Sequence, residues 1–203
     1  MVLIDYQNIH LTAHELFAPK GTPKHETLVH PLHFANQVMA SRSMRIMATA
    51  AGGQQVPPQA QVAAVQVFRG RPSNRHNPKS YARSLAQASE WTRDRRVTVV
   101  PRTLQYIWSP GRAAYEVHEK GIDVLLAIAL VREARERNYD VIVLATHDTD
   151  LEPAIEEASR LGHANIELAG WRGAKVLRPR CPVWSTYLDD LAFGRSQDRK
   201  DYT

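Results

Sequence analysis

The most informative segment of the chain is residues 141–150, which read VIVLATHDTD. Its first half is a continuous apolar run, which is typical of a strand buried on both faces of a parallel sheet. An amphipathic helix is predicted just before this strand, starting at Ile122, because apolar residues recur there with 3–4 spacing at 125, 126, 129, 130 and 134. A helix that leads directly into a buried strand indicates an α/β fold with right-handed crossovers.

The same alternation of helix and strand is expected along the rest of the chain. Apolar or β-rich runs predict further strands over 2–4, 62–68, 97–101 and 166–169. Helical spacing predicts helices over 30–41, 81–91 and 151–161, and a last short helix over 184–193. Residues 44–50 fit either a continuation of the 30–41 helix or a strand, whereas 102–117 look irregular.

These elements predict an α/β domain with a central, mostly parallel sheet of about five strands and helices on both faces. No repeat or low-complexity linker divides the chain. We therefore expect a single domain over residues 1–194 and a frayed, polar C-terminal tail over residues 195–203. In such sheets the functional cleft lies at the carboxyl ends of the strands, so residues that directly follow strands are the first candidates for a site.

The composition predicts a cytoplasmic protein. Hydrophobic residues make up 43% of the 203 residues, and no apolar run approaches the roughly 18–20 residues that span a bilayer. The N-terminal residues show no basic region of a secretory signal, and Cys181 is the only cysteine, which fits a reducing compartment. A homo-oligomer is compatible with the sequence, which does not specify one.

The charge balance is compatible with a polyanionic partner. The formal net charge is +5 and the sequence pI is about 9.5. Residues 69–83 carry five Lys or Arg residues and no acid. Such a segment is either a solvated loop or a loop that contacts phosphates, and the sequence leaves both interpretations open.

Acidic residues follow two of the predicted strands and begin one of the predicted helices. Asp5 follows the 2–4 run, Asp148 and Asp150 follow the 141–145 run, and Asp123 begins the helix before it. If these acids gather at one edge of the sheet, they repel one another unless a cation lies between them. Hard divalent cations such as Mg²⁺ or Mn²⁺ prefer oxygen ligands, and in phosphodiester hydrolysis they orient the attacking water and stabilise the leaving oxygen.

Each acid also has a simpler explanation, except Asp5. Thr149 and Glu152 have the spacing of a capping box, so the acids beside them could serve only the start of a helix. Asp123 could likewise be an ordinary acid at a helix end. Asp5 needs a partner because it carries a charge directly after a buried strand, and Asn8 could either bond to it or cap the next helix.

The ordered set of these residues resembles the NYN domain family. The resemblance rests on Asp5 and Asn8, then on the run Lys120-Gly121-Ile122-Asp123, then on the run Thr146-His147-Asp148-Thr149-Asp150, and it covers roughly residues 1–170. NYN domains are relatives of the PIN nucleases and include the LabA-like proteins. The resemblance implies a PIN-like Rossmannoid three-layer fold and divalent-metal-dependent hydrolysis of RNA. It also implies that Asp5, Asp123, Asp148 and Asp150 bind Mg²⁺ or Mn²⁺, and that Asn8 supports the first acid.

Two positions depart from the family pattern. Ala129 stands where family members often have a further Asp, so metal affinity could be weaker. His147 stands where a small residue is common; it could contact phosphate, transfer a proton or point outward, and we expect it to point outward.

The predicted RNA-binding residues come mostly from the basic segment. We expect Arg69, Arg71, Arg75 and Lys79, on the loop after the second strand, to grip the backbone of single-stranded or structured RNA, with Lys120 nearer the scissile phosphate. Thr146 keeps a hydroxyl beside the acids and is expected to bind substrate together with these basic residues. The alternatives are a non-catalytic RNA-binding or scaffold module, which Ala129 favours, and a toxin of a toxin–antitoxin pair. A zinc site among His10, His14, His30 and His33 lacks the remaining ligands.

Overall fold

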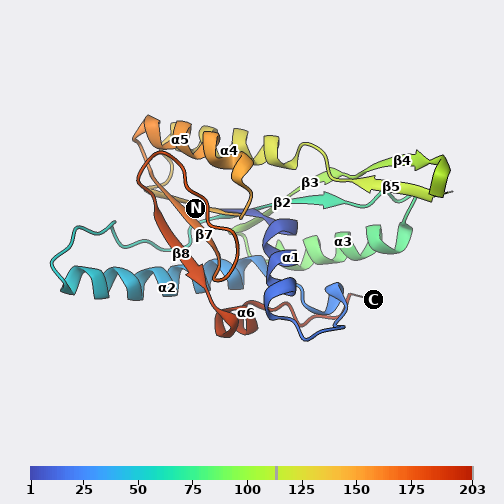
Figure 1. Ribbon diagram of the computed structural model, residues 1–203, viewed down its shortest axis with the longest axis horizontal. Coiled ribbons are helices and arrows are strands. Elements are labelled where there is room, and N and C mark those ends of the chain that lie inside the picture. Colours follow the sequence, from blue (N-terminus) through green and yellow to red (C-terminus); the bar gives the residue numbers. More distant parts are fainter. Residues whose placement is uncertain (113, 203) are drawn as a thin grey trace.

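Six parallel strands form the central sheet of the computed structural model, which describes residues 1–112 and 114–202 (Figure 1). Their order across the sheet is β3-β2-β1-β6-β7-β8. The strands are β1 (Val2–Asp5), β2 (Val65–Arg71), β3 (Val97–Thr103), β6 (Val141–Ala145), β7 (Asn165–Trp171) and β8 (Trp184–Leu188). The predicted parallel α/β sheet is confirmed, with a sixth strand at the β8 edge. Strand β1 lies in the middle, so its last residue is delivered to the centre of the carboxyl edge.

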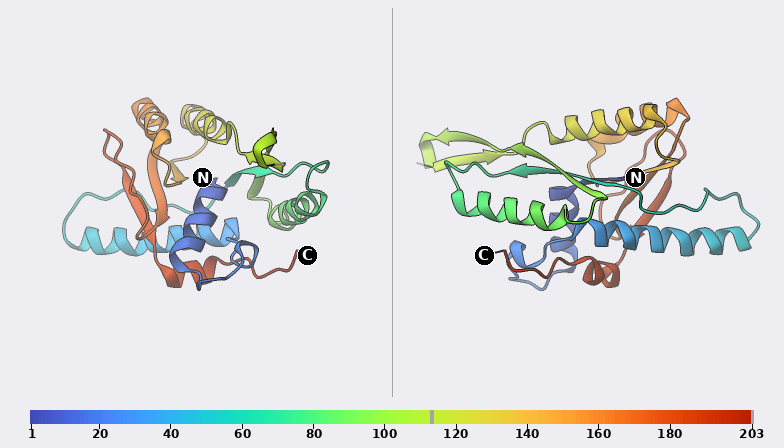
Figure 2. Two further views of the ribbon diagram at one scale, coloured as in Figure 1. Left: turned by 45° about the vertical axis from the view of Figure 1, so that its right-hand side comes forward. Right: turned by 180° about the vertical axis from the view of Figure 1, so that it is seen from behind.

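Helices cover both faces of the sheet, which gives three layers (Figures 1 and 2). One face packs against α1 (Tyr6–Phe17), α2 (Pro31–Ala51), α3 (Pro78–Trp91) and α6 (Asp190–Ser196), and the other against α4 (Ile122–Glu136) and α5 (Glu152–Leu161). Because side chains alternate along a strand, Val2 and Ile4 enter the first core while Leu3 enters the second. Short 3₁₀ turns lie at η1 (Lys24–Glu26), η2 (Pro110–Arg112) and η3 (Thr149–Leu151).

The structure decides one local prediction that was left open and corrects two others. Residues 44–50 continue the helix α2, whose Arg42 and Ile46 are buried. The described residues within 102–117 are not irregular, because β4 (Gln105–Ser109) and β5 (Ala114–His118) form an antiparallel hairpin that projects from the sheet; residue 113 of this range lies outside the described residues. The helix predicted over 184–193 is instead β8 followed by α6. The aromatic and β-branched residues of 184–188 suit a strand, and Asp189 caps α6 by accepting a hydrogen bond from the Ala192 N–H.

The C-terminal segment is packed rather than frayed over the residues described. Asp198 is buried, and its carboxylate accepts hydrogen bonds at 2.7 Å from the Trp91 indole and at 2.7 Å from the Tyr202 hydroxyl. The Asp198 N–H donates to the Leu28 carbonyl at 2.7 Å. The segment is polar in composition, but these bonds hold it against the helical layer below the sheet.

One charged pair lies inside the interface between α2 and β7. The Arg42 guanidinium makes two 2.6 Å bonds to the Glu167 carboxylate, and the two side chains are 0% and 2% exposed. A third bond joins Arg42 to the Pro58 carbonyl at 2.8 Å. The pair therefore ties α2, the sheet and the connection that leads to β2 together.

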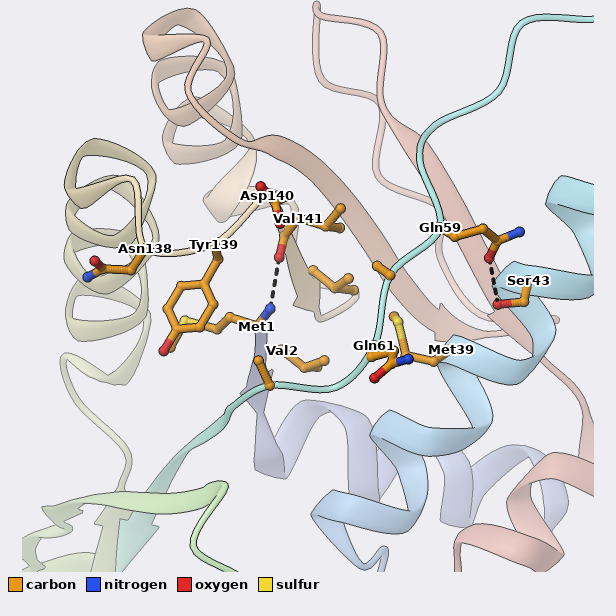
Figure 3. A pocket seen from close by; sticks show the side chains of 13 residues that line it. Met1, Val2, Met39, Ser43, Gln59, Gln61, Asn138, Tyr139, Asp140 and Val141 are labelled. Atoms are coloured by element: carbon orange, nitrogen blue, oxygen red, sulfur yellow. Dashed lines mark hydrogen bonds between the residues drawn. The ribbon is translucent and has the colours of Figure 1, made fainter.

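The amino ends of the strands carry the Met1 ammonium, on which Asp140, Glu133 and Glu167 act electrostatically. A pocket of about 600 Å³ there is lined by residues such as Met1, Ser43, Gln59 and Tyr139, with Asp140 as its one acid (Figure 3). Among the described residues, no helix combines the length and the apolar character needed to cross a membrane.

Candidate active site

Asp5 ends β1 at the carboxyl edge of the sheet and is 5% exposed. Its carboxylate accepts a 3.0 Å hydrogen bond from the Thr146 hydroxyl and a 3.4 Å bond from the Asn8 N–H, so it also caps α1. The Asn8 side chain does not cap this helix. Its amide oxygen accepts a 2.8 Å bond from the His147 N–H and so links α1 to the end of β6.

Asp148 follows β6 and caps the η3 turn, because its carboxylate accepts a 3.0 Å bond from the Asp150 N–H. The capping box suggested by the sequence does not form. The Thr149 hydroxyl instead accepts from the Lys175 ammonium at 3.0 Å, and the Glu152 carboxylate accepts from the Arg178 N–H at 2.8 Å. Asp150 is exposed beside Asp148 and has no capping role of its own.

Asp123 lies in the first turn of α4, whose start carries no side-chain cap. The preceding Gly121 adopts a left-handed conformation with φ of 77°, which favours glycine. The Arg102 guanidinium packs against Gly121 and donates a 2.6 Å bond to the Lys120 carbonyl. This turn is therefore fixed by backbone geometry, and Asp123 is free of a capping function.

The four acids influence one another electrostatically. Burial raises the pKa of Asp5 to about 7, and the negative charges of Asp123 and Glu119 add to the rise although the bonds from Thr146 and Asn8 oppose it. Burial also raises the pKa of Asp123, with further contributions from Asp148 and Asp150. The structure thus brings the predicted acids of β1, α4 and β6 into one region of negative charge.

Glu119 is an acid of this region that sequence reasoning missed as a candidate. Burial raises its pKa, the Gly70 N–H lowers it, and Asp123 raises it further. A Cβ on Gly70 would lie 2.7 Å from the Glu119 carboxylate and even closer to the Leu104 side chain. Gln7 holds the same glycine through two 3.3 Å bonds to its backbone, so Glu119 reaches the site because position 70 has no side chain.

The donor set suits a hard divalent cation. Every candidate ligand is a carboxylate oxygen. Burial is the main cause of the raised pKa values of Asp5 and Asp123, and neighbouring negative charges add to both, a repulsion that a cation would relieve. Across residues 1–112 and 114–202, however, no three His, Cys, Asp or Glu side chains are already arranged closely enough to hold a metal ion.

The raised pKa of Asp5 predicts a pH-dependent stability in EDTA. The folded state holds this proton up to about pH 7 whereas the unfolded chain releases it near pH 4, so stability falls as pH rises between those values. We expect the melting temperature of Asp5→Asn to decline less than that of wild type from pH 5 to pH 8. Thermal melts across this range test the expectation, and an equal decline in both proteins would contradict it.

The basic residues are placed differently from the prediction. Arg69 is not on a loop, because β2 extends to Arg71; its side chain is 9% exposed and donates to Gln87 at 2.9 Å. Its guanidinium lies 4.8 Å from the Tyr6 ring centroid and 5.1 Å from that of Trp91, so it is a core residue. Arg71 ends β2 and is half-buried. Arg75, Lys79 and Lys120 are exposed.

Thr146 and His147 serve the architecture of the site. Thr146 is buried, and its hydroxyl also accepts a 3.1 Å bond from the Asp148 N–H. The expectation that His147 points outward is wrong. Its ring is buried against Gly170, with Nε2 accepting from the Trp171 N–H at 3.0 Å and Nδ1 lying 2.8 Å from the Lys175 carbonyl. Burial lowers its pKa.

A second basic segment flanks the acids and was also missed. The loop after β7 carries Arg172, Lys175, Arg178 and Arg180 and no acid between them. It runs back along α5, where Glu156 accepts a 2.8 Å bond from the Arg180 N–H. The run of cations was visible in the sequence, but its position beside Thr149 depends on how the loop folds.

Comparison with known proteins supports a family assignment and a fold. The model of the NYN domain matches residues 1–182. A search of curated proteins gives no significant match. Among solved structures, a Vibrio parahaemolyticus protein of unknown function is similar, with a TM-score of 0.50 and 14% identity over 86% of this chain and 82% of that one. At this identity the likeness shows the fold alone.

Proposed function

Because the chain belongs to the NYN domain family, a PIN-like nuclease superfamily, we propose that it is a divalent-metal-dependent ribonuclease. The observation that carries the proposal is the position of Asp123, whose charge raises the pKa of Asp5 at the end of β1 and whose own pKa is raised by Asp148 and Asp150 after β6. Acids from three separate elements converge at the sheet edge where parallel α/β folds place their sites.

The residues that would hold Mg²⁺ or Mn²⁺ are Asp5, Asp123, Asp148 and Asp150. Such a cation, when bound, lowers the pKa of a water molecule and stabilises charge on phosphate oxygens. Thr146 links the ends of β1 and β6, because its hydroxyl donates to the Asp5 carboxylate and accepts from the Asp148 N–H. Asn8 fixes the end of β6 relative to α1. These bonds hold the Asp5 carboxylate and the backbone of Asp148 in place before any ligand arrives.

Cations on both sides of the acids suit a polyanionic substrate. Lys120 precedes the Asp123 turn, and Lys175 bonds to Thr149 between Asp148 and Asp150. Arg75 and Lys79 are exposed farther along the β2–α3 connection. Together they would neutralise phosphates along the strand, so binding should weaken as salt rises. Glu119, whose pKa is raised, is suited to carry a proton near the reacting groups.

The proposal is tested with the chain of residues 1–203 and fluorescently labelled RNA. We expect cleavage with Mn²⁺ or Mg²⁺, and no cleavage with EDTA. Ala129 and the lack of a closed metal cage among the described residues favour a second candidate, a binding module without activity. Salt-dependent RNA binding with no cleavage at any tested metal concentration would support that candidate and reject the ribonuclease.

A further inference from the structure

The β4–β5 hairpin carries an exposed aromatic face. Side chains alternate across a strand, so the opposed pairs Tyr106–Val117 and Trp108–Tyr115 lie on one face of the hairpin. Trp108 is 51% exposed and Tyr115 is 50% exposed, and their ring centroids are 5.2 Å apart. Neither ring packs into a core of the domain, and exposed apolar clusters of this kind mark interaction sites.

The β2–α3 connection holds this face in position. The His76 ring stacks on Tyr106 with centroids 4.4 Å apart and planes 14° from parallel, and it meets the edge of Tyr115 at 4.5 Å. The Ser73 N–H donates to the Tyr106 hydroxyl at 3.1 Å. A pocket of about 280 Å³ lies between the connection and the hairpin, lined by Pro72, His76, Tyr106, Tyr115 and Val117 among others. The rings are therefore pre-arranged.

The surroundings of the aromatic face are cationic. Arg71, Arg75 and Lys79 lie on the segment that borders it, and residues 69–83 contain no acid. The only acid of the hairpin strands, Glu116, pairs with Ile107 on the opposite face and is bridged to Arg112 at 3.3 Å. The rings thus face a positive border with no carboxylate among them, which complements a polyanion.

The hairpin also leads directly to the acids. Strand β5 ends at His118 and is followed at once by Glu119 and the turn before Asp123. At its base Leu104 packs on Gly70, the same glycine that Glu119 and Gln7 contact. The hairpin projects outward from this point along the direction of β2 and β3 (Figures 1 and 2).

We propose that the aromatic face, consisting of Tyr106, Trp108 and Tyr115, binds the bases of a single-stranded RNA whose backbone continues into the acid cluster. The inference rests on the proposed ribonuclease function and specifies its substrate class. Aromatic side chains stack on any unpaired base, whereas bases inside a duplex are stacked on each other and do not offer their faces. The cationic border contacts the phosphates, so the hairpin selects unpaired RNA over duplex RNA.

The test measures binding without metal, so that cleavage does not interfere. Fluorescence anisotropy in EDTA compares a labelled oligouridylate with a blunt RNA duplex of the same length. We expect wild type to prefer the single strand, and Trp108→Ala to weaken that binding about 5- to 100-fold. Ile107→Ala is the matched control, because Ile107 is 54% exposed on the opposite face of the same strand, and its affinity should be unchanged. Trp108→Phe should retain most of the affinity.

Other outcomes overturn the inference. Equal affinity for single strand and duplex, or unchanged affinity in Trp108→Ala, means that the rings do not stack on bases. Dimerisation that Trp108→Ala abolishes, measured by sedimentation, would make the face a protein interface. The two proposals also separate. If single-strand binding depends on Trp108 but no RNA is cleaved, only the ribonuclease proposal is rejected. If RNA is cleaved but binding does not depend on Trp108, only the stacking proposal is rejected.

Discussion

Asp148→Asn is expected to lower the rate of Mn²⁺-dependent RNA cleavage about 10³-fold while leaving the fold intact. The carboxylate is one of the charges that raise the pKa of Asp123, and it belongs to the set proposed to bind metal. Loss of one charged ligand removes several kcal/mol of charge stabilisation, and each 1.36 kcal/mol is tenfold in rate. The amide oxygen of Asn can still accept the bond from the Asp150 N–H, so the η3 turn should persist.

Two measurements make this result specific to the site. Mn²⁺ should raise the melting temperature of wild type more than that of Asp148→Asn, because a ligand that binds only the folded state stabilises it. Asp189→Asn is the matched control, since Asp189 caps α6 with a 3.0 Å bond from the Ala192 N–H and is likewise partly exposed. Its cleavage rate should equal that of wild type. Full activity in Asp148→Asn would remove this residue from the mechanism.

Glu167→Gln is expected to destabilise the protein by about 3–5 kcal/mol. The substitution leaves the Arg42 cation buried at 0% exposure without its counter-charge, and among the described residues no other acid forms an ion pair with it. For a chain of this length, the loss corresponds to a fall in melting temperature of roughly 10 °C. Urea denaturation of wild type and variant measures the free energy of unfolding directly.

A double variant separates the cost of an unpaired charge from the value of the pair. Arg42→Met combined with Glu167→Leu should recover most of the lost stability, because apolar residues of similar volume often replace a buried ion pair without loss. Asp94→Asn serves as the surface control. Its partner Arg96 is exposed, and solvent screens the pair, so the unfolding midpoint should stay near that of wild type. A small effect of Glu167→Gln would mean that water reaches Arg42.

The central strands of the sheet could be predicted because they are continuous apolar runs. The β8–α6 segment and the β4–β5 hairpin could not be predicted. Trp184, Leu188 and Leu191 have helical spacing by coincidence, which concealed the boundary between β8 and α6. The hairpin was missed because Pro110 and Gly111 break the chain between two short strands. Its exposed faces also lack the apolar alternation of a half-buried sheet.

Two of the acids could be predicted because residues that follow parallel strands lie at the carboxyl edge of the sheet, whereas the position of the residues around them could not be predicted in this way. Asp5 and Asp148 follow buried strands, so their sequence position implied their place at the sheet edge. Glu119 arrives only because the hairpin returns to Gly70, and Lys175 only because the loop after β7 folds back along α5. Arg69 lies inside the fold because β2 ends three residues later than its apolar run suggested. These placements depend on tertiary contacts that local sequence does not encode.

Both ring nitrogens of His147 are engaged by the backbone, so this histidine does not gain a positive charge beside Asp148 when the pH passes through neutrality. Nε2 accepts the Trp171 N–H and must be unprotonated, which leaves Nδ1 to carry the proton toward the Lys175 carbonyl. A second proton would break the bond to Trp171, so the ring stays neutral through the range in which free histidine changes charge. An inflection of a pH–rate profile near neutrality would therefore not arise from His147.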